Sequence, residues 1–158
     1  MPNIIGIDPG LTGGIALIAK DKIEVHKMPV LQLKKGKIID EHALCTRLET
    51  LAANVGNLLV VVEHVHAMPK QGTVSMFNFG LGFGLIRGIL CGLKKRYILV
   101  RPQEWKREVL KGYPKGSEVQ VARSLFPGVD LIQSKRARKP HSGIVDALLI
   151  AEYGRRKH

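Results

Sequence analysis

The hydrophobic positions of this chain fall into short runs near its beginning and into longer periodic segments further along. The first runs are rich in β-branched residues and are separated by turn-forming residues, so they predict an antiparallel meander. Its three strands are expected at residues 3–7, 14–19 and 23–28. Two further runs, 58–63 and 97–100, are almost entirely apolar, which is typical of central strands covered from both sides.

The longer segments carry apolar residues at helical spacing. Asp40 is a favourable N-cap for the first of them, and Pro102 suits the opening of another. Helices are therefore expected at residues 40–54, 75–95, 102–111, 115–128 and 142–156. The predicted order β-β-β-α-β-α-β-α-α-α belongs to the α/β class with a mixed sheet, and 158 residues predict a single domain, 1–158.

Glycine recurs at every fourth position of the second predicted helix, at Gly80, Gly84, Gly88 and Gly92. Each glycine in a helix interior destabilises it by about 1 kcal/mol relative to alanine. Such a stripe indicates that another helix or strand approaches the backbone closely. Two interpretations stay open at this point: packing within the domain, or contact between two subunits.

Charge changes the picture most, because 25 Lys and Arg residues stand against 13 Asp and Glu residues, a formal net charge of +12. Such an excess predicts a polyanionic partner, with nucleic acid as the first candidate and an anionic membrane surface as the second.

No signal peptide is expected at the N-terminus, and the longest apolar segment, 77–93, contains Arg87 and is short for a membrane span. Cys45 and Cys91 match no metal or redox motif. They are predicted to be reduced and buried in a cytoplasmic protein.

Three acids follow or interrupt apolar runs: Asp8 ends the first strand, Glu63 ends the fourth, and Asp146 lies near the start of the last helix. If the two strands are neighbours, a helix laid against the sheet brings all three together. Clustered carboxylates raise one another's pKa, and hard divalent cations such as Mg²⁺ relieve that repulsion. The alternatives are ordinary ones: a turn residue, a strand exit into solvent and a first-turn acid favoured by the helix dipole.

Four blocks resemble, in this order, the RuvC family of Holliday-junction resolvases, within the RNase H-like superfamily. They are "GIDPGLTGGIAL", "VVVEHVHAMPKQG", the glycine-striped helix and "HSGIVDALLIAEYGRR". The likeness is greatest to phage-type and bacterial members. It implies an RNase H-like fold with a mixed five-stranded sheet flanked by helices. It also implies a homodimeric endonuclease of DNA recombination and repair that resolves four-way junctions by symmetric paired nicks, in a bacterial or phage-infected cell.

The resemblance assigns roles to individual residues. Asp8, Glu63 and Asp146 match the family's acids, which implies catalysis with Mg²⁺, replaceable by Mn²⁺, and two ions in each active site. Two such ions activate water and stabilise the leaving oxygen of a phosphodiester. The family's striped helix belongs to the dimer contact, which favours the subunit interpretation for Gly80, Gly84 and Gly88.

One position departs from the family, because Ser142 stands where a further acid is usual, one turn before Asp146. Ser142 is also a good N-cap after Pro140. A hydroxyl is a poor Mg²⁺ ligand, so His141 is a candidate substitute. The alternative function is therefore a junction-binding dimer with weakened or no catalysis.

Basic residues lie in three segments and are expected to contact DNA phosphates, which favours binding without sequence readout and with strong salt dependence. The candidate DNA-binding residues are Lys70, Gln71, Lys106, Lys115, Lys135, Arg136, Arg138 and Lys139. Lys94, Lys95 and Arg96 form a further basic run, and any such run is alternatively a solvated face.

The segment after Glu63 is expected to line the cleft. His66 stands where some family members carry an aromatic that stacks on a base. Phe77 and Phe79 are alternative stacking residues, although core packing is the favoured role for both. The segment "IDPGLTGGIAL" also resembles the first phosphate loop of sugar kinases and actin, but the second lobe which that architecture needs is lacking.

Overall fold

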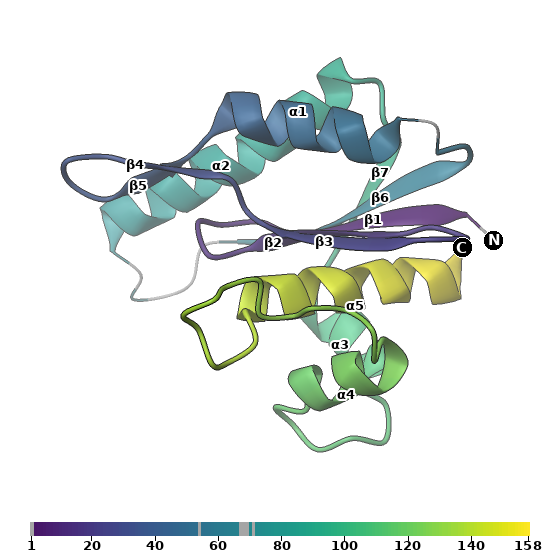
Figure 1. Ribbon diagram of the computed structural model, residues 1–158. Helices are drawn as coiled ribbons and strands as arrows, with labels where there is room; N and C mark the ends of the chain where they lie inside the picture. The colour runs from purple at the N-terminus through teal and green to yellow at the C-terminus, as the bar shows by residue number, and fades with distance from the viewer. Residues whose placement is uncertain (1, 54, 67–69, 71) are drawn as a thin grey trace.

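The computed structural model describes residues 2–53, 55–66, 70 and 72–158. A mixed sheet lies between two layers of helices (Figure 1). Its strands are β1 (Asn3–Asp8), β2 (Gly14–Ile18), β3 (Ile23–Lys27), β6 (Leu58–Glu63) and β7 (Tyr97–Val100), arranged in the order β3-β2-β1-β6-β7. The β1, β2 and β3 strands form an antiparallel meander, whereas β6 and β7 run parallel to β1. This arrangement confirms the predicted mixed sheet of five strands.

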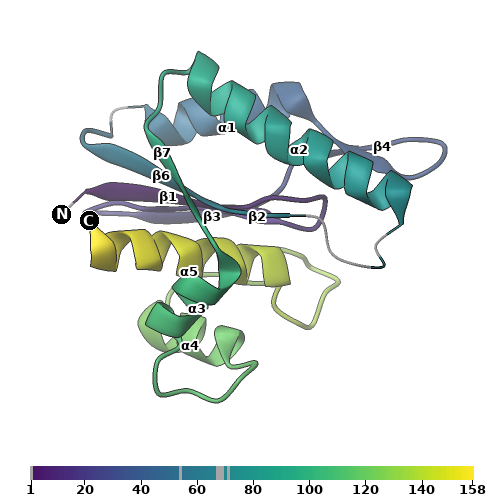
Figure 2. The ribbon, with the colours of Figure 1, turned by 180° about the vertical axis from the view of Figure 1, so that it is seen from behind.

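The helices divide between the two faces of the sheet (Figures 1 and 2). One face is covered by α1 (Glu41–Ala52) and α2 (Thr73–Gly92), and the other by α3 (Pro102–Val109), α4 (Glu118–Leu125) and α5 (Ser142–Lys157). Successive residues of a strand point to opposite faces. Ile5 and Ile7 of β1 accordingly pack on the α1 side, while Ile4 packs on the α5 side.

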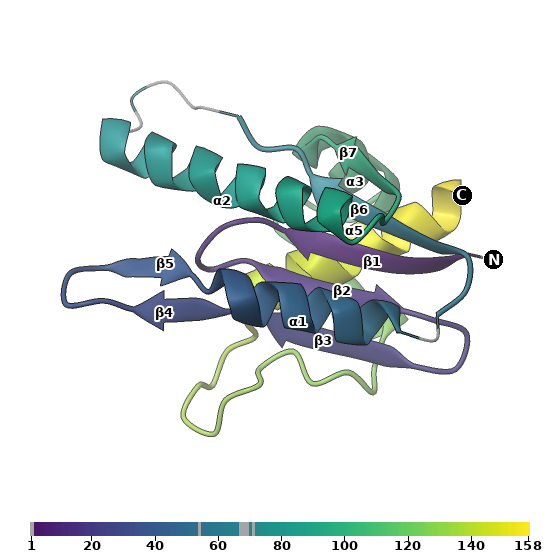
Figure 3. The same cartoon turned by 90° about the horizontal axis from the view of Figure 1, so that it is seen from above.

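The elements predicted from the sequence are present, but one hairpin was not predicted. Asp40 caps α1 as predicted, since its carboxylate accepts a hydrogen bond from the Ala43 backbone N–H at 2.9 Å. The hairpin formed by β4 (Val30–Gln32) and β5 (Lys37–Ile39) was not predicted. Its strands are short and mostly exposed, so they carry no clear apolar alternation, and the hairpin lies beside α2 when the sheet is seen from above (Figure 3).

Helix α5 packs directly onto the backbone of the sheet, because glycines occupy the contact on both sides. A Cβ on Gly6 of β1 would fall on the Ala147 carbonyl oxygen and 2.5 Å from the Ala151 nitrogen. Gly14 of β2 likewise faces the backbone of Gly143 in α5, and Gly143 faces the backbone of Thr12 and Gly13. Side chains at these positions would hold the helix away from the sheet.

Helix α2 presents the opposite case, because a Cβ on Gly80, Gly84, Gly88 or Gly92 would meet nothing within 4 Å. All four glycines are exposed, so within the described part of the chain no element covers the stripe. The interpretation that the stripe packs inside the domain is therefore wrong.

Helix α2 has 20 residues and is longer than the apolar segment noted in the sequence at residues 77–93. By length and composition alone the helix would be able to cross a membrane, and it is the one such helix among the described residues. Both cysteines are free, but Cys91 lies exposed on α2 and Cys45 is half-buried on α1. The prediction that both are buried was wrong, because their apolar neighbours belong to helices with one uncovered side.

Candidate active site

Strand pairing brings the first two candidate acids to the same edge of the sheet. In the parallel pair of β1 and β6, Ile7 lies opposite Val62, and Asp8 and Glu63 are the next residues along their strands. Ile7 and Val62 both face α1 and α2. Because side chains alternate along a strand, Asp8 and Glu63 point toward the face covered by α5.

The third acid comes from α5. This helix packs closely against the sheet because Gly6 and Gly14 have no side chains to hold it away. The helix begins at Ser142, so Asp146 lies in its second turn. The alternative that Asp146 is a first-turn acid favoured by the helix dipole is therefore wrong. Asp146 is half-buried, whereas the residues on either side of it in α5 are buried. Because α5 lies on the sheet, the ends of the neighbouring strands are close to Asp146.

The acids influence one another electrostatically, which agrees with their placement at one end of the sheet. Burial, followed by the charges of Glu63 and Asp146, raises the pKa of Asp8 to about 8. Burial also raises the pKa of Asp146 to about 6, with Lys106 opposing the shift and Glu63 adding to it. These three acids therefore form one electrostatic unit, although they come from distant parts of the sequence.

Lys106 of α3 is the cation of this unit. Its charge lowers the pKa of both Asp8 and Asp146. Burial acts to lower the pKa of Lys106 itself, but the ion pair with Glu118 and the charge of Asp146 leave it above its usual value. The Lys106 Nζ lies 3.0 Å from the Glu118 Oε1. The sequence predicted a DNA contact for Lys106, and the structure places it beside the acids.

Glu63 has a hydrogen-bond partner that the sequence analysis did not identify. The indole Nε1 of Trp105 donates to the Glu63 Oε1 at 2.8 Å. Trp105 is adjacent to Lys106 and is the single tryptophan of the chain, which was the available signal, but nothing in the sequence pairs it with an acid of β6.

The donor set suits a hard divalent cation. Three carboxylates from β1, β6 and α5 are oxygen donors of the kind that such an ion prefers, and burial, followed by the charges of neighbouring acids, raises the pKa of Asp8 and Asp146. Within the described residues, no group of three or more His, Cys, Asp or Glu side chains is arranged so that it could hold a metal ion as it stands.

The start of α5 differs from the prediction. His141, not Ser142, is the N-cap, and its Nδ1 accepts a hydrogen bond from the Ile144 backbone N–H at 3.3 Å. Ser142 is the first helical residue and is exposed, one turn from Asp146 and on the same side of the helix. Burial, with a contribution from Lys27, lowers the pKa of His141, so its ring is neutral near pH 7. Because Nδ1 accepts this hydrogen bond, the neutral ring carries its proton on Nε2, so in this arrangement neither ring nitrogen offers a free lone pair to a metal.

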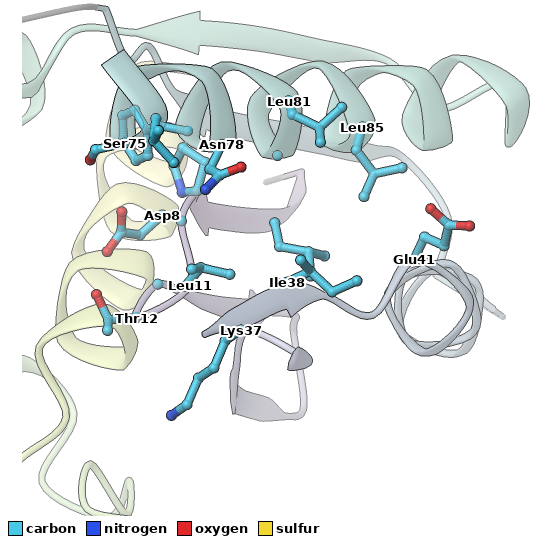
Figure 4. Close-up of a pocket in the computed structure, with 17 residues that line it drawn as sticks. Asp8, Leu11, Thr12, Lys37, Ile38, Glu41, Ser75, Asn78, Leu81 and Leu85 are labelled. Carbon is cyan, nitrogen blue, oxygen red and sulfur yellow. The ribbon is translucent and has the colours of Figure 1, made fainter. Parts of the chain in front are cut away.

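A cleft of about 850 Å³ opens next to Asp8. Its walls are the β1–β2 turn, the β4–β5 hairpin and the first half of α2, as Figure 4 shows. Leu11, Ile38 and Leu81 make it largely apolar, while Lys37 and Asn78 add polar groups.

The two phenylalanines proposed for stacking differ in position. Phe79 lines the cleft and is the nearest side chain to Gly10, whereas Phe77 is 69% exposed on α2. The favoured core role is therefore wrong for Phe77. His64 stacks on Phe83, with ring centroids 6.0 Å apart, and His66 is exposed.

The predicted DNA-binding residues do not form one patch. The segment that carries Lys135, Arg136, Arg138 and Lys139 lies at the start of α5, at the same end of the sheet as the β4–β5 hairpin (Figure 1). Lys115 lies in the connection between α3 and α4. Lys70 is exposed with a φ of 68°, and Gln71 lies outside the described residues.

Two further groups of basic side chains lie at different ends of the molecule. The hairpin carries Lys34, Lys35 and Lys37, all exposed, which the sequence analysis did not assign. Lys94, Lys95 and Arg96 follow the C-terminal end of α2, which points away from the end where the hairpin lies (Figures 1 and 3).

No protein-family model matches the chain, and no curated protein sequence matches it either. Similarity to solved structures is extensive. RuvC of Thermus thermophilus in complex with a Holliday junction substrate superposes with a TM-score of 0.64 at 18% sequence identity, over 99% of this chain and 96% of that chain.

Two resolvases from other sources show the same arrangement. The yeast mitochondrial Holliday junction resolvase has a TM-score of 0.58 at 15% identity, over 96% of this chain and 77% of that one. The Fowlpox virus resolvase, solved with substrate Holliday junction DNA, has a TM-score of 0.53 at 18% identity, over 98% and 99% of the two chains. The fold of this chain is therefore that of the RuvC-like resolvases, as the sequence motifs implied.

Proposed function

We propose that the chain is a divalent-metal-dependent endonuclease that resolves Holliday junctions by paired symmetric nicks. The observation that carries the proposal is the convergence of Asp8, Glu63 and Asp146 on one side of a RuvC-like sheet. A net charge of +12 agrees with a DNA substrate, and the similar structures include two that contain Holliday junction DNA.

The three carboxylates would hold Mg²⁺ or Mn²⁺. A bound ion would supply an activated water and charge stabilisation at the phosphodiester. Asp8 and Asp146 would release their protons more readily when such an ion is present, because its charge offsets the burial and the repulsion between acids that raise their pKa. Lys106 lies beside the same acids and offers a cation to the phosphate that approaches them.

The cations at the Asp8 end of the molecule would hold the DNA backbone. This group comprises the candidate residues of the segment before α5, together with the exposed hairpin lysines Lys34, Lys35 and Lys37, of which Lys37 lines the cleft. Phosphate contacts of this kind position the duplex without reading its sequence.

A homodimer would place two such sites on one junction. The exposed side of α2 carries Val74, Phe77 and Leu81 beside the uncovered glycines, an apolar face that two copies of the chain would bury against each other. Paired nicks at symmetric positions need this arrangement, because each subunit then cuts one strand.

The second candidate function is a junction-binding dimer without effective cleavage. The observation that favours it is Ser142, exposed on the same side of α5 as Asp146, where a hydroxyl replaces the usual acid. Both candidates bind the same DNA and differ only in the chemical step.

A synthetic four-way junction separates the two candidates. The unmodified chain with Mg²⁺ or Mn²⁺ should release paired nicked products, whereas Asp8→Asn and Glu63→Gln should abolish nicking and retain junction binding in a mobility-shift assay. Asp21→Asn, an exposed acid in the β2–β3 turn, is the matched control and should nick normally. Binding without nicking, even after Ser142→Asp, would leave only the second candidate; normal nicking by Asp8→Asn would contradict the site.

A further inference from the structure

We propose that Trp105 is a positioning residue for the candidate active site, because its indole N–H holds one oxygen of Glu63 and leaves the other to bind the cation. The inference rests on the proposed function. It adds a residue that does not bind the metal itself but orients a residue that would bind it.

The position of Trp105 is well defined. It lies in α3, is 0% exposed and belongs to the core cluster on the α5 side of the sheet. The same cluster includes Val109, Val121 and Leu148. An indole packed in this way does not change its orientation freely, so its N–H has a fixed direction.

That N–H has one acceptor in the structure, the Glu63 Oε1 at 2.8 Å. An indole nitrogen donates and does not accept, and a buried N–H without a partner destabilises a protein by about 1–3 kcal/mol. The bond to Glu63 is therefore favoured before any metal arrives. It fixes one carboxylate oxygen and with it the plane of the carboxyl group.

The other oxygen, Oε2, is then the one available to a cation next to Asp8. Carboxylates that bind metals are commonly hydrogen-bonded by a second layer of residues, and loss of such a partner typically weakens metal affinity or activity by about 10–100-fold. Trp105 has the geometry of such a partner. Its neighbour Lys106 lies with Nζ 5.2 Å from the Trp105 ring centroid, so α3 delivers both groups to the acids.

The single tryptophan makes the proposal measurable without catalysis. One indole N–H cross-peak is expected in a ¹H–¹⁵N spectrum of the full chain, and it belongs to Trp105. Addition of MgCl₂ without DNA should shift this cross-peak in a saturable manner. The shift should be lost in Asp8→Asn, which keeps the bond between Trp105 and Glu63 but removes a neighbouring ligand.

A substitution tests the same point through affinity. Trp105→Phe removes the N–H and keeps an aromatic ring, so Mn²⁺ binding measured by calorimetry should weaken about tenfold. Phe126→Leu is the matched control, because Phe126 is a buried aromatic of the same core cluster. It should lower the melting temperature and leave Mn²⁺ affinity unchanged. If Trp105→Phe does not fold, the cross-peak titration of the unmodified chain decides.

The outcomes separate this inference from the proposed function. If Mn²⁺ binds the unmodified chain and Asp8→Asn loses that binding, an unshifted indole cross-peak or an unchanged affinity of Trp105→Phe overturns the role of Trp105 alone. If the unmodified chain neither binds Mn²⁺ nor cleaves junctions, the metal-dependent function and this inference are both overturned.

Discussion

Helices α5 and α2 cover opposite faces of the same sheet, and both carry glycines, but the glycines serve different contacts. Gly143 of α5 faces the backbone of the β1–β2 region, and Gly154 faces Ile4 and Val61. Gly84 and Gly88 of α2 face open space. Glycine therefore marks a contact inside the chain at Gly143 and Gly154 of α5, whereas Gly84 and Gly88 of α2 lie on an uncovered surface.

The two helices differ in the element that faces their glycines. Beneath α5 the sheet offers Gly6 and Gly14, so two backbones meet. Beside the exposed face of α2 there is no matching element among the described residues, and Val74, Phe77 and Leu81 are 74%, 69% and 60% exposed. An apolar face of this kind is expected to bind a partner.

The largest effect is expected from Gly6→Ala, which should break the contact under α5. The new methyl group would meet the Ala147 oxygen and the Ala151 nitrogen, and helix backbone does not move aside as a flexible side chain does. We expect a loss of at least about 3 kcal/mol in the free energy of unfolding, measured by urea denaturation.

The matched control for this substitution is Gly88→Ala. Its methyl group meets nothing within 4 Å, so it should stabilise the monomer by about 1 kcal/mol through helix propensity. Equal effects of the two substitutions would show that the contrast between α5 and α2 is not one of packing.

A second prediction concerns the exposed helix. Gly84→Leu should disrupt the proposed dimer, because a large side chain would hold the two copies of α2 apart. Sedimentation equilibrium should show a change from dimer to single-chain mass, with an unchanged far-ultraviolet circular dichroism spectrum. Gln120→Leu, an exposed position on α4, should remain dimeric. A dimer that survives Gly84→Leu would mean that another surface joins the subunits.

The smallest effect is expected from the burial of Asp8, to which the charges of Glu63 and Asp146 add. The pKa of Asp8 is about 8 in the folded chain and near 3.8 in the unfolded chain, so between these values the folded state keeps a proton that the unfolded state has released. Stability is therefore lost as the pH rises from about 4 to 8. Asp8→Asn stays neutral and should remove this loss.

Urea unfolding at several pH values measures the effect. Asp8→Asn should match the unmodified chain near pH 4 and exceed its stability at pH 8 by about 1–3 kcal/mol, a value reduced from the full shift because Asp8 is only partly buried. A difference that does not change with pH would mean that folding does not raise the pKa of Asp8.

The sequence predicted most of the fold because its strands and helices have strong local signals. The runs 58–63 and 97–100 became β6 and β7 with those bounds, and Asp40 caps α1. The resemblance to RuvC resolvases named the fold that the structure comparisons then found. Its assignment of Asp8, Glu63 and Asp146 to a metal site remains a prediction, supported by their electrostatic coupling.

The features that the sequence did not predict depend on contacts between residues far apart in the chain. An apolar helix looks the same in sequence whether or not a neighbour covers it, so Phe77 and Cys91 were predicted to be buried and are exposed. The cap of α5 came from the His141 ring, which is an uncommon N-cap. The hydrogen bond from Trp105 to Glu63 joins residues 42 positions apart, and no pattern of spacing indicates it.

Lys106 gives the acids a counter-charge that is encoded in the chain itself. Many small metalloproteins fold only when their metal is present, because nothing else neutralises the ligands. Here an ammonium group partly fulfils that need, held within reach of Asp8 and Asp146 by its ion pair with Glu118. Chelation would therefore silence the proposed enzyme while leaving its architecture intact, so that metal supply would control its turnover rather than its abundance.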